Sequence, residues 1–182
     1  MQPLARLRDG LGRLTDAEHY LFSATDLRPL MPEQSDQAFR RLLSRAVRSG
    51  VLERICRGIY LYPYVDYQRG YELCHAAARL RAGTLTYISL ESALSNAGII
   101  SQVPVGHLTL MTTGRSSTIS CGRYGVIECI HTKRSIDRFS GDLIYDPACR
   151  LWRASPALAV RDLKAVGRSL DLVDWEAFYD SL

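Results

Sequence analysis

Lysine is nearly absent from this chain of 182 residues: only Lys133 and Lys164 occur, so 21 of the 23 basic residues are arginine. The planar guanidinium group suits the paired hydrogen-bond acceptors of phosphate and guanine, so this bias favours a nucleic-acid partner. A bias in the nucleotide composition of the genome explains the arginine content equally well. The net charge of +4 does not decide between the two explanations, because it is small for a nucleic-acid-binding chain.

Long apolar runs and a leader-like N-terminus are also missing. No stretch of about 18 apolar residues occurs, so we expect no membrane-spanning segment. The first nine residues carry charges where a signal peptide needs an apolar core, so we expect a cytoplasmic protein. The five cysteines are odd in number and contain no Cys-x-x-Cys pair, and the four histidines are scattered. This pattern predicts reduced thiols and neither a disulfide framework nor a metal site.

Enzyme signatures are missing as well. The sequence has no Walker loop, no Gly-x-Gly-x-x-Gly and no Gly-x-Ser-x-Gly. Cys121 lies in a Ser-Cys-Gly segment, but no histidine and acid stand in a recognisable order around it. Asp137, Asp142 and Asp146 fit no metal-binding loop and are interpreted as turn residues. We therefore predict a protein that is not an enzyme and has no cofactor. The alternative is a nuclease that uses Asp142 and Asp146.

The strongest local pattern lies in residues 14–62. It predicts a short helix over residues 15–22, a second helix that Ser23 caps, and a third that Ser35 caps and Gly50 ends. The third helix has an apolar stripe at helical spacing, formed by Phe39, Leu42, Leu43, Ala46 and Val47. Two β-like segments follow, residues 51–57 and 59–62, with a turn at Gly58. This order is typical of a winged helix-turn-helix.

The polar side of the third helix and the following hairpin form a basic segment. Residues 37–57 contain six arginines and one acid, Glu53. The predicted DNA-binding residues are Gln37, Arg40, Arg41, Ser44, Arg45, Arg48, Arg54 and Arg57. Residues in the first two turns are expected to read bases, later ones to contact phosphates, and the hairpin arginines to contact phosphate or the minor groove. Arg28, Arg115 and Arg123 are predicted as secondary contacts. The alternative is an ordinary solvated helix face.

The rest of the chain predicts a mixed α/β domain. Helices are expected over residues 71–82, over 90–96 with Ser89 as cap, after Ser155, and in the tail 172–182. Strands are expected over residues 85–88, 108–112, 126–131, 143–145 and 150–152, with a polar turn-rich run at 113–124. Residues 112–117 have a composition that suits an anion. The predicted fold class is α+β, with a winged helix-turn-helix in residues 1–66 and an α/β domain in 67–182.

Three segments carry a resemblance to a known family. In residues 42–60 a helix ends in glycine and a strand leads into Arg57-Gly58-Ile59-Tyr60. Residues 87–98 contain Tyr-Ile-Ser followed by Ser-Ala-Leu and Gly98, and residues 107–115 form a strand ending in threonine and arginine. In order and spacing these segments resemble AbiEi-type antitoxins. The chain departs from the family near its end, where residues 155–162 lack the glutamate and the basic residue of the Pro-Glu-(Lys/Arg)-Ala-Leu-hydrophobic-Asp motif.

The resemblance implies a function for both domains. It suggests the antitoxin of a type IV toxin–antitoxin system, whose partner is a nucleotidyltransferase-like toxin. The winged helix would bind inverted repeats in double-stranded DNA of its own promoter and repress transcription, and residues 67–182 would be an antitoxin-type domain. The alternative is a protein-interaction module that neutralises a toxin by direct binding. That alternative predicts a stable one-to-one complex and little affinity for DNA.

Overall fold

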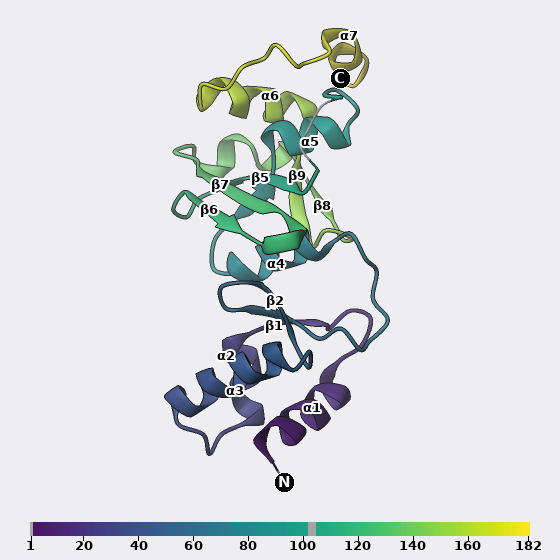
Figure 1. Cartoon of the computed structure of the whole chain (residues 1–182). Helices are drawn as coiled ribbons and strands as arrows, with labels where there is room; N and C mark the ends of the chain where they lie inside the picture. The colour runs from purple at the N-terminus through teal and green to yellow at the C-terminus, as the bar shows by residue number, and fades with distance from the viewer. Residues whose placement is uncertain (1, 102–104) are drawn as a thin grey trace. The chain divides into compact units, whose positions relative to one another are not determined.

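The chain folds into two compact units, Met1–Glu72 and Leu73–Leu182. The structure is a computed structural model and describes residues 2–101 and 105–182, which contain seven α-helices and two β-sheets (Figure 1). The fold is therefore mixed α+β. The boundary predicted between residues 66 and 67 lies within the first unit. In the described residues, no helix is both long enough and apolar enough to cross a membrane.

The first unit combines helices with a small sheet. Its elements are α1 (Pro3–Leu14), β1 (Leu21–Ser23), α2 (Ala24–Leu27), the 3-10 turn η1 (Arg28–Leu30), α3 (Asp36–Arg48), β2 (Glu53–Cys56) and β3 (Ile59–Leu61). The strands form an antiparallel sheet in the order β1-β3-β2. Leu7 and Leu11 of α1 pack with Leu42 and Leu43 of α3 in one buried cluster. This apolar contact fixes α3 by one face and leaves its other face in solvent.

The predicted helix over residues 15–22 is wrong. The chain has a helix before it, α1, and residues 21–23 form a strand that pairs with β3. Asp16 does not cap a helix, because its carboxylate oxygen accepts from the backbone N–H groups of Glu18 at 2.8 Å and His19 at 2.7 Å, which closes a turn. The cap at Ser23 is confirmed, since its hydroxyl accepts from the N–H of Asp26.

The second unit is built on a six-stranded mixed sheet in the order β6-β7-β5-β4-β9-β8. Its strands are β4 (Thr86–Ile88), β5 (His107–Thr112), β6 (Ser117–Ser120), β7 (Val126–His131), β8 (Leu143–Asp146) and β9 (Leu151–Ala154). Its helices are α4 (Glu72–Leu80), α5 (Leu90–Asn96), α6 (Pro156–Ala165) and α7 (Trp175–Asp180), with 3-10 turns η2 (Gly122–Tyr124), η3 (Ile136–Arg138) and η4 (Ser140–Asp142). In Figure 1, α5 and α6 lie above the sheet and α4 lies below it.

Two predictions for the second unit are wrong in detail. The polar run 113–124 contains β6, an edge strand whose Thr118 and Ser120 are exposed, which is why its composition is that of a loop. The side chain of Ser89 does not cap α5. Its hydroxyl instead donates to the carboxylate of Asp162 at 2.7 Å. The cap at Ser155 is confirmed, because its hydroxyl accepts from the N–H of Leu158 at 3.2 Å.

Candidate nucleic-acid interface

Helix α3 forms because its sequence has a capping residue at the N-terminal end, an apolar stripe at helical spacing and a glycine after the C-terminal end. The hydroxyl of Ser35 accepts from the N–H of Ala38 at 3.3 Å, and Asp36 places a negative charge in the first turn. The buried residues of the helix are Phe39, Leu42, Leu43 and Ala46. Gly50 follows the helix with a φ of +74°, a conformation that glycine adopts without the Cβ clash. The predicted boundaries of this helix are therefore confirmed.

The opposite side of α3 is exposed along its whole length. This basic face consists of Gln37, Arg40, Arg41, Ser44, Arg45 and Arg48, all of which are exposed. Because an α-helix turns by about 100° per residue, Arg40 and Ser44 lie on one flank, and Arg45 lies on the other. Arg41 and Arg48 lie between the flanks and point straight away from the buried stripe. The six predicted residues thus share one solvent-facing surface.

The hairpin of β2 and β3 adds two arginines beside this surface. Gly58 has a φ of +84° and makes the tight turn, with Arg57 exposed next to it. Arg54 stands on β2 opposite Tyr60 of β3, and its Nε donates to the carbonyl oxygen of Cys56 at 3.3 Å. That bond holds the stem of Arg54 along the hairpin.

An open hollow of about 660 Å³ lies between α3 and the hairpin. Its lining includes Arg40 and Ser44 from α3 and Arg54 and Arg57 from the hairpin. The structure therefore brings together four of the predicted DNA-binding residues, and Arg28, a predicted secondary contact, lines the same hollow. Gln37, Arg41, Arg45 and Arg48 do not line this hollow and continue the basic face beyond it.

Five arginines of this surface are not neutralised by a carboxylate among the described residues. Across the described residues 2–101 and 105–182, no ion pair is formed by Arg40, Arg41, Arg45, Arg48 or Arg57. By contrast, Arg134, Arg153, Arg161 and Arg168 of the second unit all pair with carboxylates. Exposed guanidinium groups that lack an internal partner are available to an anion.

Arg28, a predicted secondary contact, lines the same hollow and is also bonded to the chain around it. Its guanidinium donates to the carbonyl oxygens of Met31 and Gln34, the second at 2.6 Å. Its Nε lies 3.6 Å from the carboxylate of Asp36, and the central carbon of its guanidinium group lies 5.2 Å from the ring centre of Phe39. Arg28 therefore ties the segment before α3 to the first turn of that helix.

Arg115 and Arg123 belong to the second unit. Arg115 is exposed between β5 and β6. Arg123 donates to the hydroxyl of Tyr124 at 3.0 Å and lies 5.0 Å from the centre of its ring. In the predicted anion loop, the N–H of Gly114 donates to the hydroxyl of Thr112 at 3.1 Å, so this N–H is used within the loop.

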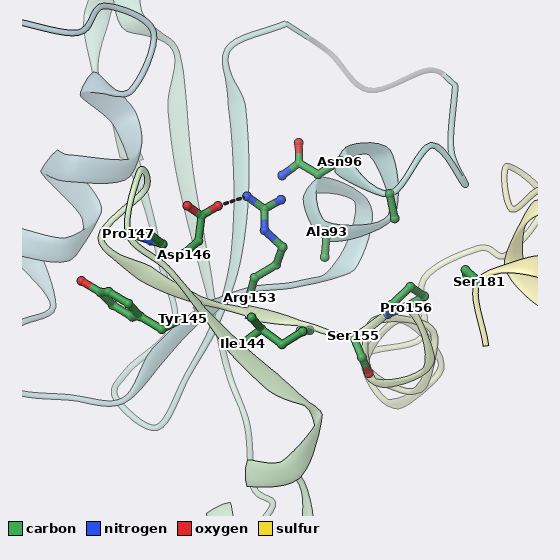
Figure 2. A pocket seen from close by; sticks show the side chains of 12 residues that line it. Ala93, Asn96, Ile144, Tyr145, Asp146, Pro147, Arg153, Ser155, Pro156 and Ser181 are labelled. Carbon is green, nitrogen blue, oxygen red and sulfur yellow. Dashed lines mark hydrogen bonds and ion pairs between the residues drawn. The ribbon is translucent and has the colours of Figure 1, made fainter.

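Asp146, one of the two acids of the alternative nuclease hypothesis, lines a second hollow. This hollow, of about 770 Å³, lies between α5, the β8–β9 hairpin and the start of α6 (Figure 2). Figure 2 shows the carboxylate of Asp146 turned toward the guanidinium of Arg153, and the two form an ion pair. Asp142 pairs with Arg161 in the same way. In the part of the chain that the structure describes, no three His, Cys, Asp or Glu side chains gather as a metal site.

A buried polar cluster in the second unit was not predicted. Asp162 is fully buried and accepts from the hydroxyls of Ser89 at 2.7 Å and Tyr87 at 3.1 Å. Its other oxygen accepts from Arg134 at 2.8 Å. Burial raises the pKa of Asp162 and also that of Tyr87. The cluster joins residues 87–98, which carry the family resemblance, to residues 155–162, where the chain departs from the family motif.

The comparison with protein families bears on the first unit. Residues 13–63 match the model of a family described as transcriptional regulator, AbiEi antitoxin. The match spans the end of α1 and continues through β1, α2, α3, β2 and β3. It confirms the predicted resemblance to AbiEi-type proteins, which are described as regulators and antitoxins. A search of curated proteins finds no match.

Proposed function

We propose that the first unit is a winged helix-turn-helix that binds double-stranded DNA through α3 and the β2–β3 hairpin. The observation that carries the proposal is the surface of exposed arginines on α3 and the hairpin, five of them without an ion pair in the described residues. The order of the elements, with two helices before α3 and a hairpin after it, supports the same assignment. The family match over residues 13–63 supports it independently.

The position of each side chain on α3 suggests its role. Gln37, Arg40 and Arg41 lie in the first two turns, from which side chains reach base edges in the major groove. Arg45 and Arg48 lie in the last turn and would contact phosphates, as would Arg54 and Arg57 on the hairpin. The hydroxyl of Ser44 donates to the carbonyl oxygen of Arg40 at 3.0 Å and would have to give up that bond to donate to the DNA backbone. Arg28 would keep α3 in place and, as a lining residue of the hollow, would be a secondary DNA contact.

The regulatory setting follows from the family. We propose that the protein acts in the cytoplasm as the antitoxin of a type IV toxin–antitoxin system and represses its own promoter by occupying inverted repeats there. The partner would be a nucleotidyltransferase-like toxin encoded beside it. Residues 67–182 would form the antitoxin-type domain. In such systems the antitoxin and toxin need not form a tight complex, so repression is the more direct readout.

A reporter assay tests the repressor function. The DNA upstream of the chain's own gene is fused to a reporter, and expression is measured with wild-type protein, with the Arg41→Ala, Arg45→Ala double variant, and without protein. We expect wild-type protein to lower expression and the double variant to restore it at equal protein level. Unchanged expression with wild-type protein, together with a stable complex with the neighbouring gene product on a sizing column, would support the protein-interaction alternative.

A further inference from the structure

Two of the five cysteines lie in contact in the second unit. Cys74 is in the first turn of α4, and Cys149 is in the turn that joins β8 to β9. Their thiol groups are hydrogen-bonded to each other. The residues beside them are also joined, because the Nε2 of His75 lies 2.8 Å from the carbonyl oxygen of Ala148. Helix and turn are thus held together at two consecutive positions.

The turn holds Cys149 in a defined conformation. One carboxylate oxygen of Asp146 accepts from the N–H groups of Ala148 at 3.0 Å and Cys149 at 3.1 Å. The other oxygen is bound by Arg153, as Figure 2 shows. Arg150, the next residue, has a φ of +57°, which is uncommon for a residue with a side chain. The turn therefore fixes the backbone from which the buried side chain of Cys149 extends.

The two thiols differ in acidity. The hydrogen bond from Cys149 stabilises the thiolate of Cys74 and lowers the pKa of Cys74, and the charge of Arg153 adds to this effect. The same contact raises the pKa of Cys149. The guanidinium of Arg153 lies 3.7 Å from the sulfur of Cys149. The thiolate is the reactive form of cysteine, and Cys74 is the more exposed of the two thiols, so Cys74 takes the role of the nucleophile.

We propose that Cys74 and Cys149 are an oxidation site at which hydrogen peroxide converts the two thiols into a reversible disulfide. The thiolate of Cys74 attacks one peroxide oxygen, the O–O bond breaks, and the leaving hydroxide takes up a proton to become water. The sulfur of Cys149 then attacks the sulfenic acid of Cys74. The S–O bond breaks, and the hydroxyl leaves as water with the proton of Cys149. Two thiols are oxidised as one peroxide is reduced, and a small dithiol reverses the reaction.

The remaining cysteines provide internal controls. Cys56, Cys121 and Cys129 are 4%, 0% and 1% exposed. Buried thiols in apolar surroundings react slowly with peroxide. Cys74 is partly exposed and is therefore the accessible member of the proposed pair. The reaction does not depend on DNA binding by the first unit.

Peptide mapping tests the proposal. The reduced full-length protein is treated with hydrogen peroxide, the remaining thiols are alkylated after denaturation, and the digest is analysed by mass spectrometry. We expect one cross-linked peptide pair that contains Cys74 and Cys149, a mass lower by two hydrogen atoms, and reversal by dithiothreitol. The cross-link should be lost in Cys74→Ser and Cys149→Ser and retained in the control Cys129→Ser.

Labelling of the intermediate tests the assigned roles. In Cys149→Ser, a cyclic 1,3-diketone should trap the sulfenic acid on Cys74, whereas Cys149 in Cys74→Ser should stay unlabelled. The proposal is overturned if the wild-type protein keeps all five thiols at a peroxide concentration that oxidises the thiols of the unfolded chain. It is also overturned by a disulfide that involves Cys56, Cys121 or Cys129, or by over-oxidation of Cys74 without any cross-link.

Discussion

Replacing Arg41 by alanine separates base reading from general attraction to DNA. Arg41 lies on the exposed side of α3 and forms no ion pair within the described residues. Alanine favours a helix at least as strongly as arginine does. We therefore expect Arg41→Ala to change the free energy of unfolding by no more than about 0.5 kcal/mol. Any loss of DNA affinity then reports a lost contact and not a damaged fold.

The expected loss depends on which group of the DNA Arg41 contacts. A paired hydrogen bond to a base contributes about 1–3 kcal/mol of discrimination, which corresponds to about 5- to 150-fold in Kd for the specific duplex. Affinity for a scrambled duplex should change much less. Arg48→Ala should instead weaken binding to both duplexes alike. With about five phosphates neutralised, log K should fall with log salt at a slope near −4.5, and Arg48→Ala should reduce that slope by about 1.

Fluorescence anisotropy measures both effects. A labelled duplex from upstream of the gene and a scrambled duplex are titrated with each protein at three salt concentrations. Arg138→Ala is the matched control, because it removes an exposed arginine from η3 of the second unit. The assignment of α3 as the reading helix is refuted if neither Arg41→Ala nor Arg48→Ala changes affinity, slope or discrimination.

Three further predictions concern the support of the site and the buried cluster. Arg28→Ala should lower the free energy of unfolding of the first unit by about 1–3 kcal/mol, because two carbonyl oxygens lose their donor; Arg28→Lys should recover only part of it, and equal urea midpoints would contradict this role. Ser35→Ala should cost about 1 kcal/mol through loss of the α3 cap, measured by thermal unfolding, whereas an unchanged Tm would show that the cap is unimportant. Burial raises the pKa of Asp162 above its ordinary 3.8, so the stability that Asp162 contributes is fully present below pH 3.8 and is lost as pH rises through the folded pKa. Asp162→Asn should therefore remove this decrease from the curve of unfolding free energy against pH. A curve for the variant that runs parallel to the wild-type curve would argue against this effect of Asp162.

The parts of the site that could be predicted are those set by local sequence. Helix α3 has its cap at Ser35, its stripe at helical spacing and its stop at Gly50, and all three signals lie within 16 residues of one another. The hairpin turn needs only Gly58 and two flanking β-like segments. The basic face follows directly, because the helical period fixes which side chains lie opposite the apolar stripe.

The parts that were missed depend on contacts between distant residues. Residues 21–23 form a strand only because β3, nearly 40 residues later, supplies the backbone partners. The polar run around Thr118 pairs with β7 as an edge strand, so its composition resembles that of a loop. The hydrogen bonds of Arg28 to carbonyl oxygens of the following turn were not predicted. The contacts of Asp162 with Tyr87 and of Cys149 with Cys74 join residues 75 positions apart in each case, which no local pattern indicates.

A mobility-shift experiment on the full-length protein tests the central claim most directly. The protein is mixed with a duplex from upstream of its own gene and with a scrambled duplex of equal length, each at a low and a high salt concentration. The account predicts a discrete complex with the upstream duplex at protein concentrations that leave the scrambled duplex free, and weaker binding of both at high salt. No complex with either duplex, or equal affinity for the two, would contradict sequence-specific DNA binding by this protein.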